Sequence, residues 1–288
     1  MNPLALITKH PKLRPHAQRI RAELRLALRW ALRHKPHWLP GRLVVSLTSY
    51  PKRFKGLATT LKTLLSQEVR PDFVVLWIYK DDAHLLPPNV LRLRSKGLSI
   101  RIVDVDMRSY LKLVPALAEF DDAYIVTADD DIYYPRDWLS MLVSAVKLER
   151  REVVGLRGRW IEFEADGSFA PYTCWKFLEK ETPASARVLL TGVGGTLYPP
   201  NCFTTEVADV NKFLSLAPST DDLWFYFLLR KNGYVCRQVG GWIPSEIVEG
   251  SQQQSLWAIN EGGENDRAWN RLVEAFGCPT PAEAEEGN

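Results

Sequence analysis

The sequence predicts an α/β fold in which a mostly parallel sheet is flanked by helices. Short β-branched, apolar runs alternate with segments of helical spacing along residues 42–148, which is the order of a parallel sheet covered by helices. The chain has 288 residues, of which 46% are hydrophobic and 25% charged, so it can bury a sizeable core. Polar or acidic residues follow several of the apolar runs, and parallel strands bring such residues to one edge.

The first half of the chain supplies four strands and the helices between them. Apolar runs bounded by turn residues predict strands over residues 42–48, 73–79, 98–105 and 123–127. Helical spacing predicts helices over residues 57–65, 90–93, 110–120 and 138–148. Pro115 should mark either the first turn of its helix or a kink.

The second half is less regular. Strands are expected over residues 153–156 and 234–238, and a Gly-rich run interrupts residues 188–197. A helix over residues 221–231 has Ser219-Thr220 before it and Asn232-Gly233 after it, which are good signals for its start and its end. A last helix is expected near residues 268–276, and residues 278–288 form an acidic tail that we expect to be disordered.

Residues 1–40 form a basic arm in front of the body, which we take as one domain over residues 41–277. Up to residue 42 the chain carries ten Lys or Arg and one acid, so the net charge of +3 conceals a basic arm on a mildly acidic body. The arm should form an amphipathic helix that lies on an anionic membrane surface or docks on the body. Its apolar stripe is Ile20, Leu24, Leu28 and Leu32, beside Arg21, Arg25, Arg29 and Arg33.

The bulk sequence also bears on location. The four cysteines are far apart and form no C-x-x-C pair, which argues against a zinc ribbon and suits a reducing compartment. No apolar run is long enough to span a bilayer, and no export signal opens the chain. We therefore expect a cytoplasmic protein, peripheral on the inner face of the membrane, with no nucleic-acid partner.

Three adjacent carboxylates, Asp129, Asp130 and Asp131, directly follow the fourth expected strand. Such a cluster repels itself unless solvent screens it or a cation binds, and a hard divalent cation prefers oxygen ligands. The alternative interpretation is a solvated acidic turn before the helix that begins near Pro135. The position at a strand end favours a metal site.

In this setting the sequence resembles the GT-A fold glycosyltransferases, in particular family 2-like bacterial enzymes of polysaccharide, capsule and lipopolysaccharide synthesis. The resemblance rests on V-V-S-L-T-S-Y-P, on the Asp-x-Asp of Asp129 to Asp131, on T-G-V-G-G-T-L-Y-P-P at 191–200 and on D-D-L-W-F at 221–225. It covers roughly residues 40–270. It implies the GT-A (Rossmann-like) fold, Mn²⁺ or Mg²⁺ as cofactor and a nucleotide-sugar donor, with UDP favoured.

The resemblance also implies roles for individual residues. Asp129 and Asp131 would contact the ribose and hold the metal, and Asp130 could replace either of them because the register of three acids is ambiguous. The nucleotide-binding residues would be Thr48, Ser49 and Tyr50 at the first strand, and Asp81 or Asp82 at the second. Arg108 and Lys112 would approach the diphosphate, although a surface cation pair at a helix start explains them equally well.

The Asp221-Asp222 pair begins a helix, where Asp is favoured in any case by capping and by the helix dipole. The resemblance implies instead that Asp222 deprotonates the acceptor hydroxyl and that Asp221 is its acidic predecessor. Gly194 and Gly195 would lie between donor and acceptor sites, although a simple turn explains them too. All five histidines precede the Asp cluster, which favours an inverting mechanism because many retaining relatives take a His ligand from the C-terminal part.

The expected function is transfer of a sugar to a glycan or a lipid-linked acceptor. A sugar nucleotidyltransferase would need a Gly-rich loop after the first strand, where this chain has S-Y-P-K-R-F. A Mg²⁺-dependent phosphohydrolase normally carries its Asp-x-Asp after the first strand rather than the fourth. A non-catalytic carbohydrate-binding protein of the same fold is the third alternative. The sequence leaves the sugar, the acceptor, the linkage and the oligomeric state open.

Overall fold

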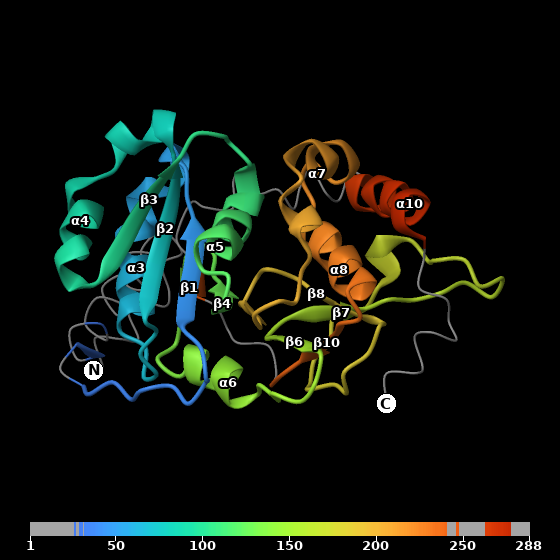
Figure 1. The fold of residues 1–288 in the computed structure, drawn as a ribbon, viewed down its shortest axis with the longest axis horizontal. Coiled ribbons are helices and arrows are strands. Elements are labelled where there is room, and N and C mark those ends of the chain that lie inside the picture. The colour runs from blue at the N-terminus through green and yellow to red at the C-terminus, as the bar shows by residue number, and fades with distance from the viewer. Residues whose placement is uncertain (1–25, 27–28, 31, 241–245, 248–262, 278–288) are drawn as a thin grey trace, which may run out of the picture.

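A computed structural model describes residues 26, 29–30, 32–240, 246–247 and 263–277 of the chain. Its centre is a seven-stranded sheet of order β10-β6-β9-β4-β1-β2-β3. The strands β3, β2, β1 and β4 are parallel neighbours, β6 and β10 are parallel to each other, and β9 runs antiparallel to both β4 and β6. The predicted α/β fold with a mostly parallel sheet is therefore confirmed (Figure 1).

The strands of this sheet are short. They are β1 (Leu43–Thr48), β2 (Phe73–Tyr79), β3 (Leu98–Val103), β4 (Tyr124–Thr127), β6 (Glu152–Gly155), β9 (Thr196–Tyr198) and β10 (Val235–Gln238). Two further pairs lie outside it: β5 (Ile132–Tyr133) with β11 (Glu246–Ile247), and β7 (Gly158–Trp160) with β8 (Val188–Leu190).

Helices cover both faces of the sheet. The α-helices are α3 (Phe54–Leu65), α4 (Pro88–Leu91), α5 (Val114–Glu119), α6 (Trp138–Ser144), α7 (Val210–Leu216), α8 (Asp221–Lys231) and α10 (Asn265–Phe276). Short 3₁₀ turns are η1 (Pro51–Arg53), η2 (Lys80–Leu85), η3 (Arg92–Lys96), η4 (Arg108–Lys112), η5 (Tyr172–Cys174) and η6 (Thr205–Ala208).

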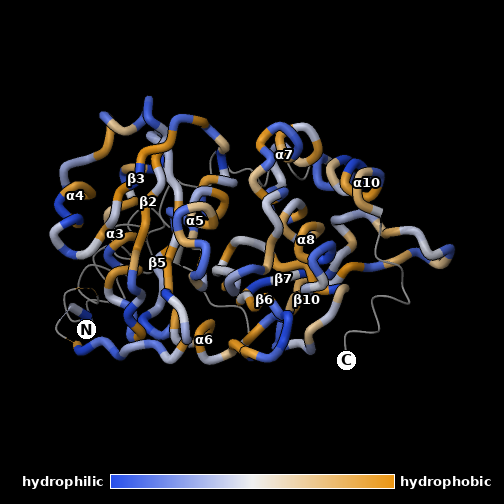
Figure 2. The backbone as a smooth tube through the Cα atoms, viewed as in Figure 1, coloured by the Kyte–Doolittle hydropathy of each residue, from blue (hydrophilic) through white to orange (hydrophobic). Residues whose placement is uncertain are grey.

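The sheet divides the core into two apolar clusters, as its buried strands require. In β1, Val44 belongs to the cluster that holds residues of α5, α7, α8 and α10, whereas Val45 belongs to the cluster with α3, α4 and α6. Both valines are fully buried. Strands covered on both faces read as continuous apolar runs, which is why the sequence shows them so clearly. Figure 2 shows this concentration of hydrophobic residues along the central strands.

Several predicted bounds need correction. The third strand ends at Val103 rather than at residue 105, and α6 ends at Ser144 rather than at residue 148. The predicted helix over 110–120 is divided into η4 and α5, with Pro115 in the first turn of α5, where its missing N–H costs nothing. The run 188–197 is divided into β8 and β9, with the glycines between them.

The described part of the basic arm contacts the body. Leu26 is buried, and the Arg29 guanidinium donates a hydrogen bond to the Tyr134 carbonyl oxygen over 2.8 Å. Leu32, which belongs to the predicted apolar stripe, is instead 48% exposed. The rest of the predicted arm helix and the predicted disordered tail, 278–288, lie outside the described residues. In the described chain no helix has both the length and the apolar character needed to cross a bilayer.

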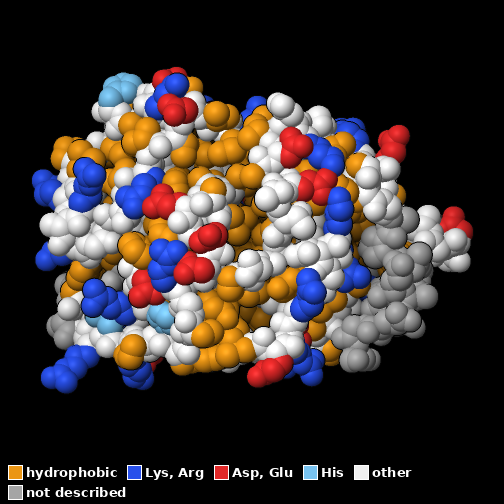
Figure 3. Space-filling model, in the orientation of Figure 1, with side chains coloured by type: hydrophobic (Ala, Val, Ile, Leu, Met, Phe, Trp, Pro, Cys, Tyr) orange, Lys and Arg blue, Asp and Glu red, His pale blue; other side chains and the backbone are white. Residues whose placement is uncertain are grey.

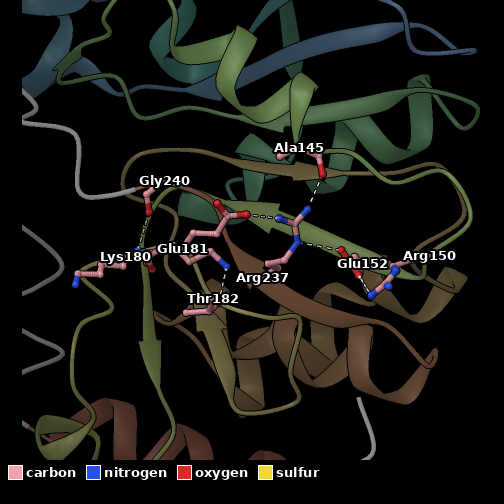
Figure 4. A network of polar contacts seen from close by, with 9 residues as sticks. Ala145, Arg150, Glu152, Lys180, Glu181, Thr182, Arg237 and Gly240 are labelled. Atoms are coloured by element: carbon pink, nitrogen blue, oxygen red, sulfur yellow. Dashed lines mark hydrogen bonds and ion pairs between the residues drawn. The ribbon is translucent and has the colours of Figure 1, made fainter. Parts of the chain in front are cut away.

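A buried arginine ties the far end of the sheet together (Figure 4). Arg237 of β10 is 5% exposed, and its guanidinium donates to Glu152 of β6 over 3.0 Å, to Glu181 over 3.0 Å and to the Ala145 carbonyl after α6 over 2.6 Å. Arg150 pairs with the same Glu152 over 3.3 Å. The cluster joins two parallel strands, a loop and a helix end, and each of its buried charges has a partner.

Candidate active site

The strand order places one edge of the sheet where a ligand is expected. In the described sheet β1 has β2 on one side and β4 on the other, so the connections from β1 and from β4 leave at a switch point. In open parallel sheets, ligands bind outside the carboxyl ends of the strands at such a point. Ser49 follows β1 and Asp129 follows β4, so both lie at this edge.

The antiparallel strand β9 brings a distant segment to the same edge. Thr196 at the start of β9 lies opposite Thr127 at the end of β4, and also opposite Gly155 at the end of β6. The turn over residues 191–195, which precedes β9, therefore lies beside the acidic run that follows β4. On the face drawn in Figure 3, hydrophobic side chains gather between the half with β1–β3 and the half with α7 and α8.

Two of the three adjacent acids are held by the first strand's turn. The Ser49 hydroxyl donates to Asp130 Oδ2 over 2.5 Å, and Arg53 Nη1 lies 2.7 Å from Asp130 Oδ1 and 3.2 Å from Asp131 Oδ2. Burial raises the pKa of Asp130, while Arg53 and Ser49 oppose that shift. The guanidinium is thus a fixed countercharge for this part of the cluster.

Lys112 is a buried member of the site and not a surface cation. Its side chain is 12% exposed, and its Nζ lies 3.3 Å from Asp221 Oδ2 and 3.6 Å from Asp129 Oδ1. Burial lowers the pKa of Lys112, but Asp221, Asp129 and Asp222 together raise it above its ordinary value. The interpretation of Lys112 as half of a surface cation pair is therefore wrong, since the ammonium joins the end of β4 to the start of α8.

Asp222 is oriented by the turn before β9 and not by its own helix. Its Oδ1 accepts a hydrogen bond from the Gly192 N–H over 3.0 Å, whereas the α8 cap position, Thr220, makes no side-chain cap bond. Burial, and next the charge of Asp221, raise the pKa of Asp222 to about 7. A carboxylate whose pKa is raised to near neutral pH is suited to general-base work.

Asp129 faces Lys112 and several other carboxylates. Burial raises the pKa of Asp129 to about 6; Lys112 opposes this shift, and Asp131, Asp130 and Asp221 add to it. Asp129 is also the more exposed of the predicted ligand pair, with 18% of its side chain accessible against 11% for Asp131.

The acidic run fits a divalent cation that takes most of its ligands from substrate. Among the described residues, the ion pairs of this run engage Oδ1 of Asp129 and Oδ2 of Asp131, each at 3.2 Å or more, so the second oxygen of each carboxylate forms no ion pair there. No group of three or more His, Cys, Asp or Glu among the described residues could hold a metal. Mg²⁺ is commonly bound by one or two carboxylates together with substrate phosphates and water, so two acids are sufficient.

In the glycine run, the residue beside the charged side chains is Gly192, whereas Gly194 and Gly195, which were predicted to contact a ligand, lie against Trp138. A Cβ on Gly192 would lie 2.6 Å from Lys112 Nζ and 3.2 Å from Asp222 Oδ1, so this glycine is the one that allows the charged side chains to meet. Gly195, at φ +101°, would place a Cβ 2.7 Å from the Trp138 ring, and the Gly194 carbonyl accepts from Trp138 Nε1. Contact of Gly194 and Gly195 with a ligand stays a prediction.

The remaining predicted residues lie around the same sheet edge. Thr48 donates its hydroxyl to the Trp77 carbonyl, and Tyr50 is exposed, with its ring 5.6 Å from the Arg53 guanidinium carbon. Asp81 and Asp82 lie in η2, directly after β2. Burial, followed by the charges of Asp106 and Asp81, raises the pKa of Asp82.

Arg108 begins η4 with a positive φ of 53°, and its backbone N–H donates to the Asp106 carboxylate. Its guanidinium is in none of the ion pairs of the described residues, in contrast to Lys112 four positions later. The two cations predicted to act together therefore have different environments. Contact of Thr48, Tyr50, Asp81, Asp82 or Arg108 with a nucleotide stays a prediction.

Sequence reasoning missed three residues of this edge: Arg53, Gly192 and Arg157. Arg157 follows β6, and its carbonyl oxygen accepts from the Thr191 N–H, one residue before the glycine that binds Asp222. The rule that ligands meet strand ends would have pointed to Arg157, because its strand was predicted. Gly192 had no such signal, since its role depends on Lys112, 80 positions earlier.

Comparisons with known proteins add limited information. No protein-family model matches the chain, and no curated protein matches it. Among solved structures, it is similar to S. aureus TarS 1–349, with a TM-score of 0.43 and 16% identity, and to the same protein in complex with UDP, at 0.44 and 17%. Each alignment covers 69% of this chain and 58% of TarS.

A further similar structure is GalNAc-T7 with UDP, GalNAc and Mn²⁺, with a TM-score of 0.47 and 11% identity, over 81% of this chain and 48% of that one. The chain thus spans about half the length of these structures. Likeness at this level does not identify a reaction, and the function has to follow from the arrangement of Lys112, Asp129, Asp221 and Asp222.

Proposed function

We propose that the protein is a metal-dependent, inverting glycosyltransferase that moves a sugar from a nucleotide-diphosphate sugar, most simply a UDP-sugar, to a glycan or lipid-linked acceptor. The observation that carries the proposal is the meeting of two acidic elements at the switch point. Lys112 bridges Asp129 after β4 and Asp221 at the start of α8, and Asp222 lies beside them with a pKa raised to about 7.

Asp222 is the proposed general base. It accepts the proton of the acceptor hydroxyl as that oxygen attacks the anomeric carbon, and the bond from this carbon to the diphosphate oxygen breaks on the opposite side. The Gly192 N–H holds Asp222 Oδ1, so the other carboxylate oxygen is the one directed to the proton. A base with a pKa near the working pH combines a deprotonated population with useful proton affinity.

Lys112 and Arg53 keep the acids in place for the donor. Lys112 limits the repulsion between Asp129 and Asp221, and Arg53 does the same for Asp130 and Asp131. Asp129 and Asp131 would hold Mn²⁺ or Mg²⁺, which when bound supplies countercharge for the departing nucleoside diphosphate.

The basic arm would keep the enzyme on the inner face of the membrane, next to a lipid-linked acceptor. Two observations support this part of the proposal. Leu26 is buried and Arg29 binds the Tyr134 carbonyl oxygen, so these two residues of the arm contact the body. Leu32 of the apolar stripe stays exposed beside a strongly basic segment, a combination that suits an anionic lipid surface.

The first experiment measures thermal stabilisation of the full chain by UDP, GDP, CDP, dTDP and ADP, each with Mn²⁺ or with EDTA. We expect one nucleotide to raise the melting temperature only when metal is present, because ligands stabilise the state that binds them. Asp129→Asn should abolish the metal-dependent part. Asp166→Asn in an exposed turn is the matched control and should leave it unchanged.

The proposal fails if no nucleotide with either cation stabilises the wild-type chain. Equal stabilisation with Mn²⁺ and with EDTA would support a nucleotide site and refute its dependence on a metal. Hydrolysis of phosphate esters, or glycan binding without any turnover, would then identify the phosphohydrolase or the carbohydrate-binding alternative.

A further inference from the structure

Two arginines next to the site share one aromatic ring. The guanidinium carbon of Arg159, in β7, lies 3.7 Å from the ring centroid of Phe177, and that of Arg157 lies 4.4 Å from the same centroid. Arg159 also lies 4.8 Å from the Tyr172 ring, and its Nη1 donates to the Trp175 carbonyl oxygen over 2.7 Å. The ring and the carbonyl hold the two flat cations close together, in a fixed orientation.

In the described structure no carboxylate lies within ion-pair distance, 4 Å, of either guanidinium. None of the ion pairs found there includes Arg157 or Arg159, whereas Arg187, which also stacks on aromatic rings, pairs with Glu162. Burial, and next the charge of Arg159, lower the pKa of Arg157. Two guanidiniums at a shared ring repel each other, and an oxyanion bound between them would remove that repulsion.

The pair lies on the Asp222 side of the site. The Arg157 carbonyl oxygen accepts from the Thr191 N–H, and the next residue, Gly192, donates to Asp222. Among the acids that act on Arg157, Asp222 has a larger effect than Asp129. Burial, and next the charge of Asp222, raise the pKa of Tyr172. The Arg157 backbone therefore holds the residue next to Gly192, whose N–H binds the proposed base.

We propose that Arg157 and Arg159 bind an oxyanion carried by the acceptor, either a phosphate or a carboxylate, and so place the acceptor hydroxyl at Asp222. The inference rests on the proposed function and narrows its acceptor to an acidic glycan or a phosphorylated carrier. The planar fork of arginine suits both groups, because two parallel N–H donors match two oxygens. Phe177 is 44% exposed, so the ring that both guanidiniums contact is open to solvent.

The test uses the full chain, saturated with its stabilising nucleoside diphosphate and Mn²⁺ so that the donor site is filled. Affinities of glucose 6-phosphate, glucuronate and glucose are measured by titration calorimetry at constant ionic strength. We expect glucose 6-phosphate or glucuronate to bind at least tenfold more tightly than glucose. The better of the two identifies the anion as phosphate or carboxylate.

Three variants assign this preference to the pair. Arg157→Gln and Phe177→Leu should each weaken the anionic sugar about tenfold, and both change side chains that are at least partly exposed, so the fold should persist. Arg151→Gln is the matched control: Arg151 is exposed, stacks on Tyr234 and binds the Asn232 carbonyl at the C-terminal end of α8, whereas Asp222 lies in the first turn of that helix. It should change no affinity by more than twofold.

The outcomes separate the two proposals. Equal binding of charged and neutral sugars, or equal loss in Arg151→Gln, would overturn the inference. Loss of nucleotide affinity in Arg157→Gln would overturn it as well, since the arginines would then serve the donor diphosphate. A wild-type chain that binds no nucleotide, but binds the anionic sugar through Arg157, would refute the glycosyltransferase and keep the anion site.

Discussion

Replacing Gly192 by alanine tests the site with a single methyl group. The added Cβ would lie 2.6 Å from Lys112 Nζ and 3.2 Å from Asp222 Oδ1, whereas ordinary contact begins near 3.4 Å. The ammonium therefore has to move by roughly 0.8 Å, and the carboxylate by a few tenths, because real carbon atoms do not approach so closely. Lys112 cannot swing freely, since Asp221 and Asp129 hold it.

The expected cost falls on activity and not on stability. Misplacement of a catalytic group by about 1 Å costs on the order of 10²-fold in rate, so we expect turnover to fall about 10- to 100-fold. Gly192 is not among the glycines with positive φ, so alanine adds no backbone strain. Alanine also lowers the conformational entropy of the unfolded chain, which raises the free energy of unfolding by about 0.4–1 kcal/mol. The melting temperature should therefore stay within a few degrees of the wild-type value.

The assay is release of the nucleoside diphosphate from the donor that the nucleotide screen identifies, at saturating donor. Gly167→Ala is the control: no atom lies within 4 Å of its added Cβ, and its φ of +83° allows only a local stability cost. Turnover of Gly192→Ala equal to that of the control would refute the reasoning, because Lys112 and Asp222 would then be outside the reacting centre.

Three further predictions concern charge and packing. Asp222→Asn should lower turnover by about 10²- to 10⁴-fold and abolish the rise of rate through pH 7 that the wild-type base produces. Folding raises the Asp222 pKa from 3.8 to about 7, so the stability that protonated Asp222 contributes is fully present below pH 3.8 and is lost as pH rises through 7. At pH 8 the Asn variant should therefore have the higher melting temperature. Arg237→Met removes the buried partner of Glu152 and leaves it only the exposed Arg150, so it should cost about 3–5 kcal/mol in urea unfolding. Adding Glu152→Gln should recover much of this cost. Gly195→Ala places a methyl group 2.7 Å from the Trp138 ring at a φ of +101° and should lower the free energy of unfolding by about 1–3 kcal/mol.

Each of these has a result that would contradict it. A pH–rate profile of Asp222→Asn parallel to that of the wild type would assign the base elsewhere. Unchanged urea midpoints for Arg237→Met would mean that solvent reaches Glu152, and an unaltered midpoint for Gly195→Ala would mean that the Trp138 ring has room to move.

The parts of the fold that the sequence predicts well are those with local causes. The bounds of β2 and α8 agree with the predicted ones, because an uninterrupted apolar run and the Asn232-Gly233 stop are legible along the chain. Gly233 indeed has the positive φ, +72°, of a helix C-terminus. Thr220 occupies the predicted cap position but makes no cap bond, so a correct boundary rested on a partly wrong reason.

The parts that sequence reasoning missed depend on distant pairings. That β9 runs antiparallel between β4 and β6 has no local signature, because its three residues pair with partners about 40 to 70 positions away. Lys112 reads as a helix-start cation until Asp221, far along the chain, is seen beside it. The position of the acidic run in the sequence places it at the edge of the sheet. The sequence does not show that Arg53 pairs with Asp130 and Asp131 while Lys112 pairs with Asp129.

The antiparallel strand also makes the site a joint product of both halves of the chain. Lys112 and Asp129 come from the first half, while Gly192 and Asp222 come from the second, and β9 is the strand that hydrogen-bonds the two halves into one sheet. A molecule in which either half has folded alone holds half of a charge network, with carboxylates that lack their ammonium. Turnover therefore requires the complete sheet, and the specific activity of a preparation measures the fraction of its molecules in which β9 joins the two halves.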